Sequence, residues 1–197
     1  MPPNTTVGYQ TIYTDKDKFL RNDEASKLHN EGKRLQRAHN YAAAEQCYLR
    51  AIAIRDELWG MGSTQAAVNQ VALAEMYVEM GKLDEAEWTF QHVLEVYDQH
   101  QALRDHFDAA AVRESLAQVY EAKGDGREAR RVRARGLPNH LACGNYKCPG
   151  AMFTIKAVQR CSHCKCIMYC TPVCQNADWK RHKKYCKEVA RSLGIDP

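Results

Sequence analysis

Eight of the nine cysteines lie in a 44-residue stretch from Cys143 to Cys186, where one histidine joins them and the donors are spaced in pairs. The pairs are Cys143 and Cys148, Cys161 and Cys164, Cys170 and Cys174, and His182 and Cys186. A structural zinc ion takes four sulfur or nitrogen donors in a tetrahedron, so eight donors predict two zinc sites. Because so short a stretch buries little apolar surface, we expect the metal ions to supply much of its folding free energy.

A disulfide framework is the alternative interpretation of this spacing. It is disfavoured because nine cysteines cannot all form pairs and because a disulfide scheme gives His182 no role. In addition, we find no basic and apolar secretory signal at the start of the sequence. Two cysteines remain outside the pairs. We expect Cys166 to be a surface thiol, with competition for the metal as the alternative, and Cys47 to be a core residue of a helix.

Further residues between the cysteine pairs follow a known pattern. Tyr169 precedes Cys170, Gln175 follows Cys174, and Trp179 lies three residues before His182. With these residues the stretch resembles the MYND-type zinc finger, although four residues separate Cys143 from Cys148 where two are commoner.

That resemblance implies that the donor pairs interleave. Zinc 1 would be held by Cys143, Cys148, Cys170 and Cys174, and zinc 2 by Cys161, Cys164, His182 and Cys186. It also implies that Gln175 and Trp179 line a shallow groove for a proline-containing extended peptide. The alternative for Trp179 is a place in the core of the finger.

Between Asp23 and Arg135, apolar residues and alanines recur every three or four positions and proline is absent, which predicts a run of helices. Small residues also repeat at intervals of 42 and 43 residues: Gly32, Ala74 and Ala117, with Ala44, Ala86 and Ala129 twelve residues after them. Because small residues let antiparallel helices approach closely, each repeat is predicted to be a helical hairpin. Ser63 and Asp125 are predicted N-caps.

These repeats resemble the tetratricopeptide repeat in a 42-residue form. The resemblance implies a concave groove lined by His29, Lys33, Gln36, Arg37, Glu75 and Glu79. Its mixed charge does not favour a clamp for a C-terminal carboxylate, and an array without any ligand is the alternative. The last predicted helix of the array contains five arginines, which we interpret as solvent-facing: Arg127, Arg130, Arg131, Arg133 and Arg135.

The predicted fold is therefore mostly α, a helical-hairpin array followed by a small two-zinc interleaved finger. We divide the chain into a polar N-terminal arm (1–22), the array (23–137), the finger (143–186) and a C-terminal tail (187–197).

The formal net charge differs between the region up to the end of the array and the region that contains the finger. Residues 1–138 hold 18 Lys and Arg against 21 Asp and Glu, a formal −3, whereas residues 139–197 hold 10 against 3, a formal +7. Seven thiolates and two Zn²⁺ would add −7 + 4 = −3 to the finger, which leaves about +4. Much of the basic run from Lys180 to Lys184 therefore balances metal–thiolate charge.

We expect a binding module and no enzyme, because sites with four protein donors leave no open zinc position and no stretch remains for a SET domain, which some proteins with this finger carry. The leading hypothesis is a zinc-binding protein-interaction adaptor in transcriptional or signalling regulation. It would recruit proline-containing peptides of partner proteins and bind neither membranes nor small-molecule substrates. The alternatives are a nucleic-acid-binding regulator, through the basic helix of the finger, and a ubiquitin-ligase-like or enzyme-associated subunit. The expected location is cytoplasmic and/or nuclear.

Overall fold

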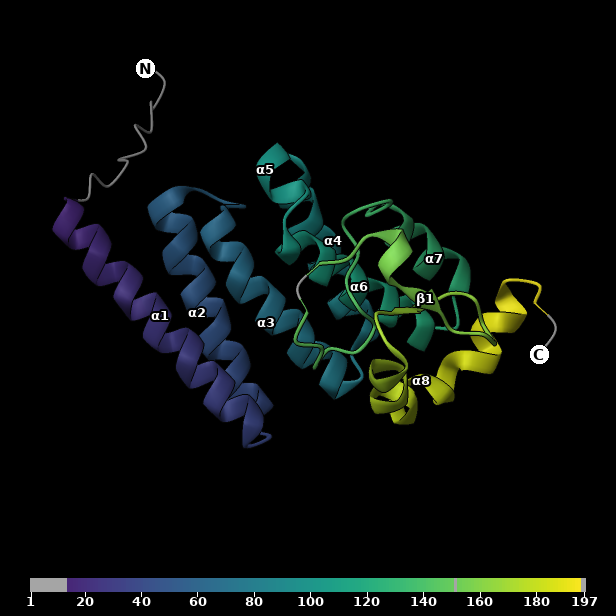
Figure 1. The fold of residues 1–197 in the computed structure, drawn as a ribbon. Coiled ribbons are helices and arrows are strands. Elements are labelled where there is room, and N and C mark those ends of the chain that lie inside the picture. The colour runs from purple at the N-terminus through teal and green to yellow at the C-terminus, as the bar shows by residue number, and fades with distance from the viewer. Residues whose placement is uncertain (1–13, 151, 196–197) are drawn as a thin grey trace, which may run out of the picture.

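The computed structural model describes residues 14–150 and 152–195, and it is mostly helical as predicted. In chain order the elements are α1 (Asp15–Arg37), α2 (Tyr41–Trp59), α3 (Thr64–Met80), α4 (Leu83–Asp98), α5 (Gln101–Arg104), α6 (Phe107–Ala122), α7 (Gly126–Ala134), the 3-10 helix η1 (Ile155–Ala157), β1 (Gln159–Arg160), β2 (Met168–Tyr169) and α8 (Pro172–Ser192). The helices of the array follow one another across the molecule, and the finger with α8 lies against the last of them (Figure 1).

Three helical hairpins make up the array: α1 with α2, α3 with α4, and α6 with α7. The small residues that repeat in the sequence are all buried: Gly32, Ala44, Ala74, Ala86, Ala117 and Ala129. In the first hairpin a Cβ on Gly32 would lie 2.7 Å from the Tyr48 ring, so the two helices approach closely enough to require glycine. The repeat therefore identified the helix contacts.

Both predicted N-caps are confirmed. The Ser63 hydroxyl accepts the backbone N–H of Ala66, and the Asp125 carboxylate accepts those of Arg127 and Glu128. These bonds satisfy amide groups that the first turn of a helix leaves free, which sets where α3 and α7 begin.

The first helix starts earlier than predicted. α1 begins at Asp15, so residues 15–22 are helical and do not belong to a polar arm. The Thr14 hydroxyl accepts the N–H of Asp17, and the Asp17 carboxylate accepts the N–H of Thr14, which forms a capping box. This first part of α1 is exposed and lacks an apolar stripe, so periodicity did not reveal it. The rest of the predicted arm, residues 1–13, lies outside the described residues.

The finger combines a short β-hairpin with one long helix. β1 and β2 pair antiparallel, with Gln159 opposite Tyr169. α8 continues to Ser192, so the predicted C-terminal tail is helical over its first half. The end of α8 packs on the start of α7, where the Gly126 N–H donates to Ser192 Oγ at 3.0 Å. A Cβ on Gly126 would lie 2.5 Å from that oxygen, which explains the glycine at this contact.

Array and finger share one apolar core. A single cluster of buried side chains includes Phe90 and Leu116 from the array together with Ile167 and Val189 from the finger. The finger therefore covers the end of the array and does not hang from a free linker. None of the described helices combines the length and the apolar character needed to cross a lipid bilayer.

Candidate metal centre

The first donor cluster brings together two cysteines from the loop after α7, one directly after β2 and one from the first turn of α8: Cys143, Cys148, Cys170 and Cys174. The sulfur of Cys148 lies 3.5 Å from that of Cys170, which lies 3.6 Å from that of Cys174. Zn–S bonds of about 2.3 Å in a tetrahedron place the sulfur atoms about 3.8 Å apart. The cluster therefore fits a zinc ion.

The second cluster consists of Cys161, Cys164, His182 and Cys186, all of them buried. The sulfurs of Cys161 and Cys186 are 3.9 Å apart, and Nε2 of His182 lies 3.5 Å from the sulfur of Cys164. Nε2 is thus the ring nitrogen that faces the donors. The eight donors form the two interleaved groups that the resemblance implied, and two zinc ions are the cofactor of the finger.

Local backbone structure positions these donors. The tight turn between β1 and β2 carries Cys161 and Cys164, and the Cys161 N–H donates to the Ile167 carbonyl at 2.9 Å. Thr171 caps α8 by accepting the Cys174 N–H at 3.2 Å, so the helix begins beside a donor. His182 and Cys186 lie four residues apart on α8, which places both side chains on one face.

Cys166, which we expected at the surface, is 2% exposed and belongs to neither donor cluster. Its sulfur accepts an N–H of Arg133 at 3.1 Å and lies 3.8 Å from the Gly126 carbonyl. The expectation was wrong because α7 of the array covers this turn of the finger. Cys47, expected in the core, is only partly buried.

Arg133 is 4% exposed, so the interpretation of the α7 arginines as solvent-facing is wrong for this residue. Its Nε and Nη2 donate to the two carboxylate oxygens of Glu114 at 2.7 Å, and its Nη1 donates to Oε1 of Glu121 at 2.8 Å. Glu114 is 6% exposed and Glu121 is fully buried, and both belong to α6. A buried ion-pair cluster thus joins α6 to α7 in the third hairpin, on the side that the finger covers.

Glu121 also faces the finger. Its Oε2 lies 3.5 Å from Nη1 of Arg181 and 3.8 Å from Nδ1 of His182. Burial would raise the pKa of this carboxyl, but the charges of Arg133 and Arg181 together with His182 lower it to about 2. An ionised carboxylate of the array therefore lies beside the second donor cluster, and no motif within the finger indicated it.

The basic run at residues 180–184 contains fewer free cations than its sequence indicates. The Arg181 guanidinium points inward and donates to both carboxylate oxygens of Asp178, at 2.8 and 2.6 Å. Lys180, Lys183 and Lys184 are exposed. In the array, Arg131 pairs with Glu128 and Arg135 with Asp98. These pairs reduce the charge available to a nucleic acid.

Gln175 and Trp179, the predicted peptide-binding residues, lie one turn apart on α8 and share a face. Trp179 is 44% exposed, so its indole is not buried in the core of the finger. Its ring centroid lies 5.9 Å from that of His182, which places the indole beside a donor of the second cluster. Gln175 is partly buried.

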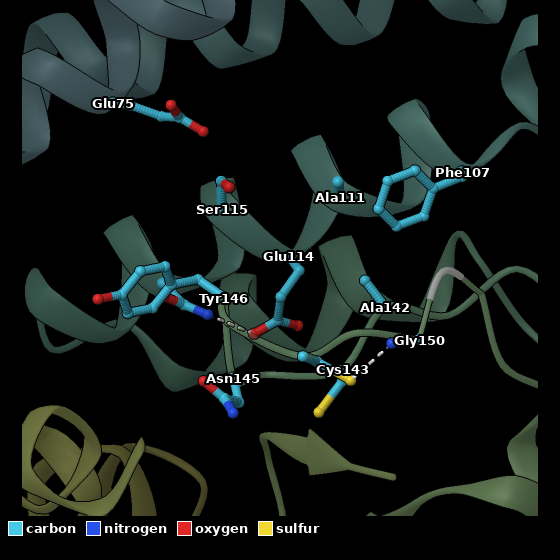
Figure 2. Close-up of a pocket in the computed structure, with 12 residues that line it drawn as sticks. Glu75, Phe107, Ala111, Glu114, Ser115, Ala142, Cys143, Asn145, Tyr146 and Gly150 are labelled. Carbon is cyan, nitrogen blue, oxygen red and sulfur yellow. Dashed lines mark hydrogen bonds between the residues drawn. The ribbon is translucent and has the colours of Figure 1, made fainter. Parts of the chain in front are cut away.

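A separate groove of about 150 Å³ lies between the array and the first cysteine loop (Figure 2). α6 contributes Phe107, Ala111 and Ser115 to one side, Tyr146 of the finger lies on another, and Glu75 reaches in from α3. Sequence reasoning did not identify this groove, because its sides come from segments far apart in the chain.

A second hollow follows the array groove that the repeat resemblance implied. Its lining includes five of the six implied residues: Lys33, Gln36, Arg37, Glu75 and Glu79. The sixth, His29, does not line it and lies with its ring centroid 5.8 Å from that of Tyr48. Lys33 and Arg37 bring positive charge to the side of α1, and the two glutamates bring negative charge to the side of α3.

Comparison with known families supports both parts of this description. The tetratricopeptide repeat family matches residues 23–99, and the MYND finger family matches residues 142–186. The chain thus carries a tetratricopeptide-repeat region followed by a MYND finger, which confirms both resemblances. Both are protein-interaction modules. The third hairpin lies beyond the matched repeats, in agreement with its unusual buried arginine.

Similar curated proteins share only the finger. SET domain-containing protein 14 of Caenorhabditis elegans is 38% identical over 42 residues, which are 21% of this chain and 10% of that protein. SET domain and MYND-type zinc finger protein 6 of Schizosaccharomyces pombe is 53% identical over 41 residues, 20% of this chain and 8% of that protein. A SET and MYND domain-containing protein of Dictyostelium discoideum is 50% identical over 32 residues, which are 16% of this chain and 6% of that protein. The chain therefore covers a tenth or less of these relatives.

Metal analysis should separate the donors from the remaining thiol of the finger. Freshly purified protein should contain two zinc ions per chain by elemental analysis. Cys170→Ala should lose one ion, because three remaining donors do not complete a structural site. Cys166→Ala is the matched control, since it removes a buried thiol that belongs to neither cluster. Loss of zinc from the control would contradict the assignment of the donors.

Proposed function

We propose that this protein is a zinc-stabilised adaptor and no enzyme, and that its finger recruits proline-containing extended peptides of partner proteins through Trp179 and Gln175. The observation that carries the proposal is the 44% exposure of Trp179 on a helix whose donors Cys174, His182 and Cys186 are anchored by both clusters. An aromatic ring presented on a fixed backbone loses little entropy on binding, and proline rings pack well against such surfaces. The Gln175 amide, one turn away, offers hydrogen bonds to a peptide backbone.

The chemistry of the two clusters supports binding over catalysis. Each cluster has four protein donors, which complete a tetrahedral zinc site without a position for an activated water. None of the nine cysteines, all of which lie in the described part of the chain, forms a disulfide, which suits a reducing compartment. We therefore place the adaptor in the cytoplasm or nucleus, in transcriptional or signalling regulation.

Substitution of Trp179 tests the proposal. The probes are synthetic extended peptides with prolines and the same peptides with alanine at those positions. Trp179→Ala should weaken binding of the proline peptides at least about tenfold, because truncating an aromatic anchor costs about 2 kcal/mol. Both zinc ions should remain bound. Tyr146→Ala is the control, because Tyr146 is an exposed aromatic residue of the finger that is not part of α8 and lines the groove of Figure 2.

Several outcomes would reject the proposal. Loss of zinc from Trp179→Ala would show that the indole supports the finger structurally. Equal binding of the alanine peptides would remove the preference for proline, and a larger loss in Tyr146→Ala would move the binding surface to the groove. If a single-stranded oligonucleotide bound more tightly than any peptide, with a steep salt dependence that Lys183→Ala with Lys184→Ala reduced, the protein would be a nucleic-acid binder.

A further inference from the structure

One nitrogen of the zinc-binding histidine lacks a hydrogen-bond partner among the described residues. Nε2 of His182 faces the sulfur donors, so a neutral imidazole with its metal bound carries its proton on Nδ1. His182 is fully buried, and its Nδ1 makes no hydrogen bond to any part of the chain that the structure describes. A buried donor without an acceptor destabilises the folded state. An acceptor within reach of Nδ1 would remove this destabilisation.

The carboxylate of Glu121 is in that position. Its Oε2 lies 3.8 Å from Nδ1 of His182, longer than a hydrogen bond, and a shift of under about 1 Å would bring it to about 2.9 Å. Its other oxygen, Oε1, accepts from Arg133 at 2.8 Å, which holds the carboxylate with Oε2 toward the finger. Glu121 is fully buried, so water does not compete for the histidine proton.

We infer that Glu121 is the outer-shell carboxylate of the second zinc site and that the array supplies it to the finger. Glu121 accepts the Nδ1–H of His182, and this bond fixes the tautomer and the orientation of the imidazole and increases the basicity of Nε2. Glu121 is a positioning residue, because it acts on the metal through His182. The first site has four cysteine donors, so the effect belongs to the second site alone.

The contact between Glu121 and His182 couples zinc binding at the second site to the docking of the array against the finger. If docking of α6 against α8 strengthens zinc binding at the second site, zinc at that site strengthens docking by the same free energy. A partner that separated α6 from α8 would weaken zinc binding, and loss of that zinc would loosen the third hairpin.

A pair of matched variants tests the inference in the full chain. Glu114 and Glu121 are both buried carboxylates of α6 that pair with Arg133, but only Glu121 approaches His182. With a chromogenic chelator as competitor, E121Q should release one zinc ion about 10- to 100-fold more readily than the unmodified protein and keep the other unchanged. E114Q should release both ions much as the unmodified protein does. Cadmium-113 resonances of the cadmium-loaded protein distinguish a four-cysteine site from one with a histidine, and so identify the ion that is lost.

The state of the imidazole provides a second, independent measurement. In zinc-loaded protein with ¹⁵N-labelled histidine, Nδ1 of His182 should carry a slowly exchanging, hydrogen-bonded proton, and its resonance should shift in E121Q but not in E114Q. Equal release of zinc from both variants, or loss from the four-cysteine site, would overturn the inference. If E121Q does not fold in excess zinc, the unmodified protein decides: a hydrogen-bonded Nδ1–H supports the inference, and a rapidly exchanging or absent proton overturns it.

Discussion

Replacing Arg133 with alanine should lower the free energy of unfolding by about 3–5 kcal/mol, the cost of breaking a buried ion pair from one side. The guanidinium is 4% exposed, and it is held between Glu114 and Glu121 in the interior. Alanine would leave two buried carboxylates without their shared partner, and it would remove the donor that contacts the sulfur of Cys166. Urea denaturation followed by circular dichroism measures the change.

The control for this substitution is Arg131→Ala on the same helix. The Arg131 side chain is 71% exposed and pairs with Glu128 three residues before it. Exposed pairs of this kind contribute about 0.2–1 kcal/mol, so the control should unfold close to the unmodified protein. Similar losses in the free energy of unfolding in the two variants would show that the burial of Arg133 does not determine its contribution to stability.

Removal of both zinc ions should unfold more than the finger. Amide protection against hydrogen exchange should fall about 100-fold or more in α6 and α7, because about 3 kcal/mol of local stability depends on their contact with a folded finger. Leu116 and Val119 of α6 belong to the same apolar cluster as Ile167 and Val189. The buried apolar residues of the first hairpin, α1 with α2, belong to clusters separate from the one that contains the finger, so this hairpin should keep its protection. Hydrogen-exchange mass spectrometry with and without a strong chelator measures both regions.

Return of the protection in α6 and α7 when zinc is added back is the control for irreversible damage. Unchanged exchange in these helices after chelation would mean that the array folds without help from the finger. Equal loss of protection in the first hairpin would mean that the chain unfolds as one unit. The prediction that zinc removal spares this hairpin would then be wrong.

The surface of the finger has two distinct exposed aromatic residues. Trp179 stands on α8 beside His182, whereas Tyr146 borders the groove against α6 and is 76% exposed. The metal clusters hold both segments, since Cys143 and Cys148 flank Tyr146 while Cys174 and His182 flank Trp179. Zinc thus fixes the backbone that carries each of these two aromatic residues.

Local patterns in the sequence determined the donors and the helices. Donor pairs with two to four residues between their members are a local feature of the chain, and this spacing was enough to predict two zinc sites. The repeat of Gly32, Ala74 and Ala117 marked buried positions of the hairpins, because small residues recur where helices pack closely. Caps such as Ser63 are equally local, since the donor lies three residues away.

Only the tertiary structure decided which polar residues are buried. Arg133 and Cys166 both looked exposed, yet they contact each other across 33 residues of sequence where α7 meets the finger. No sequence pattern singled out Glu121, yet its Oε2 lies 3.8 Å from Nδ1 of a zinc-binding histidine 61 positions later. Burial depends on which distant surface covers a residue, so the periodicity of one helix cannot reveal it. The sequence therefore specified the metal donors and the helical repeat, whereas the docking of array and finger assigned roles to the charged residues between them.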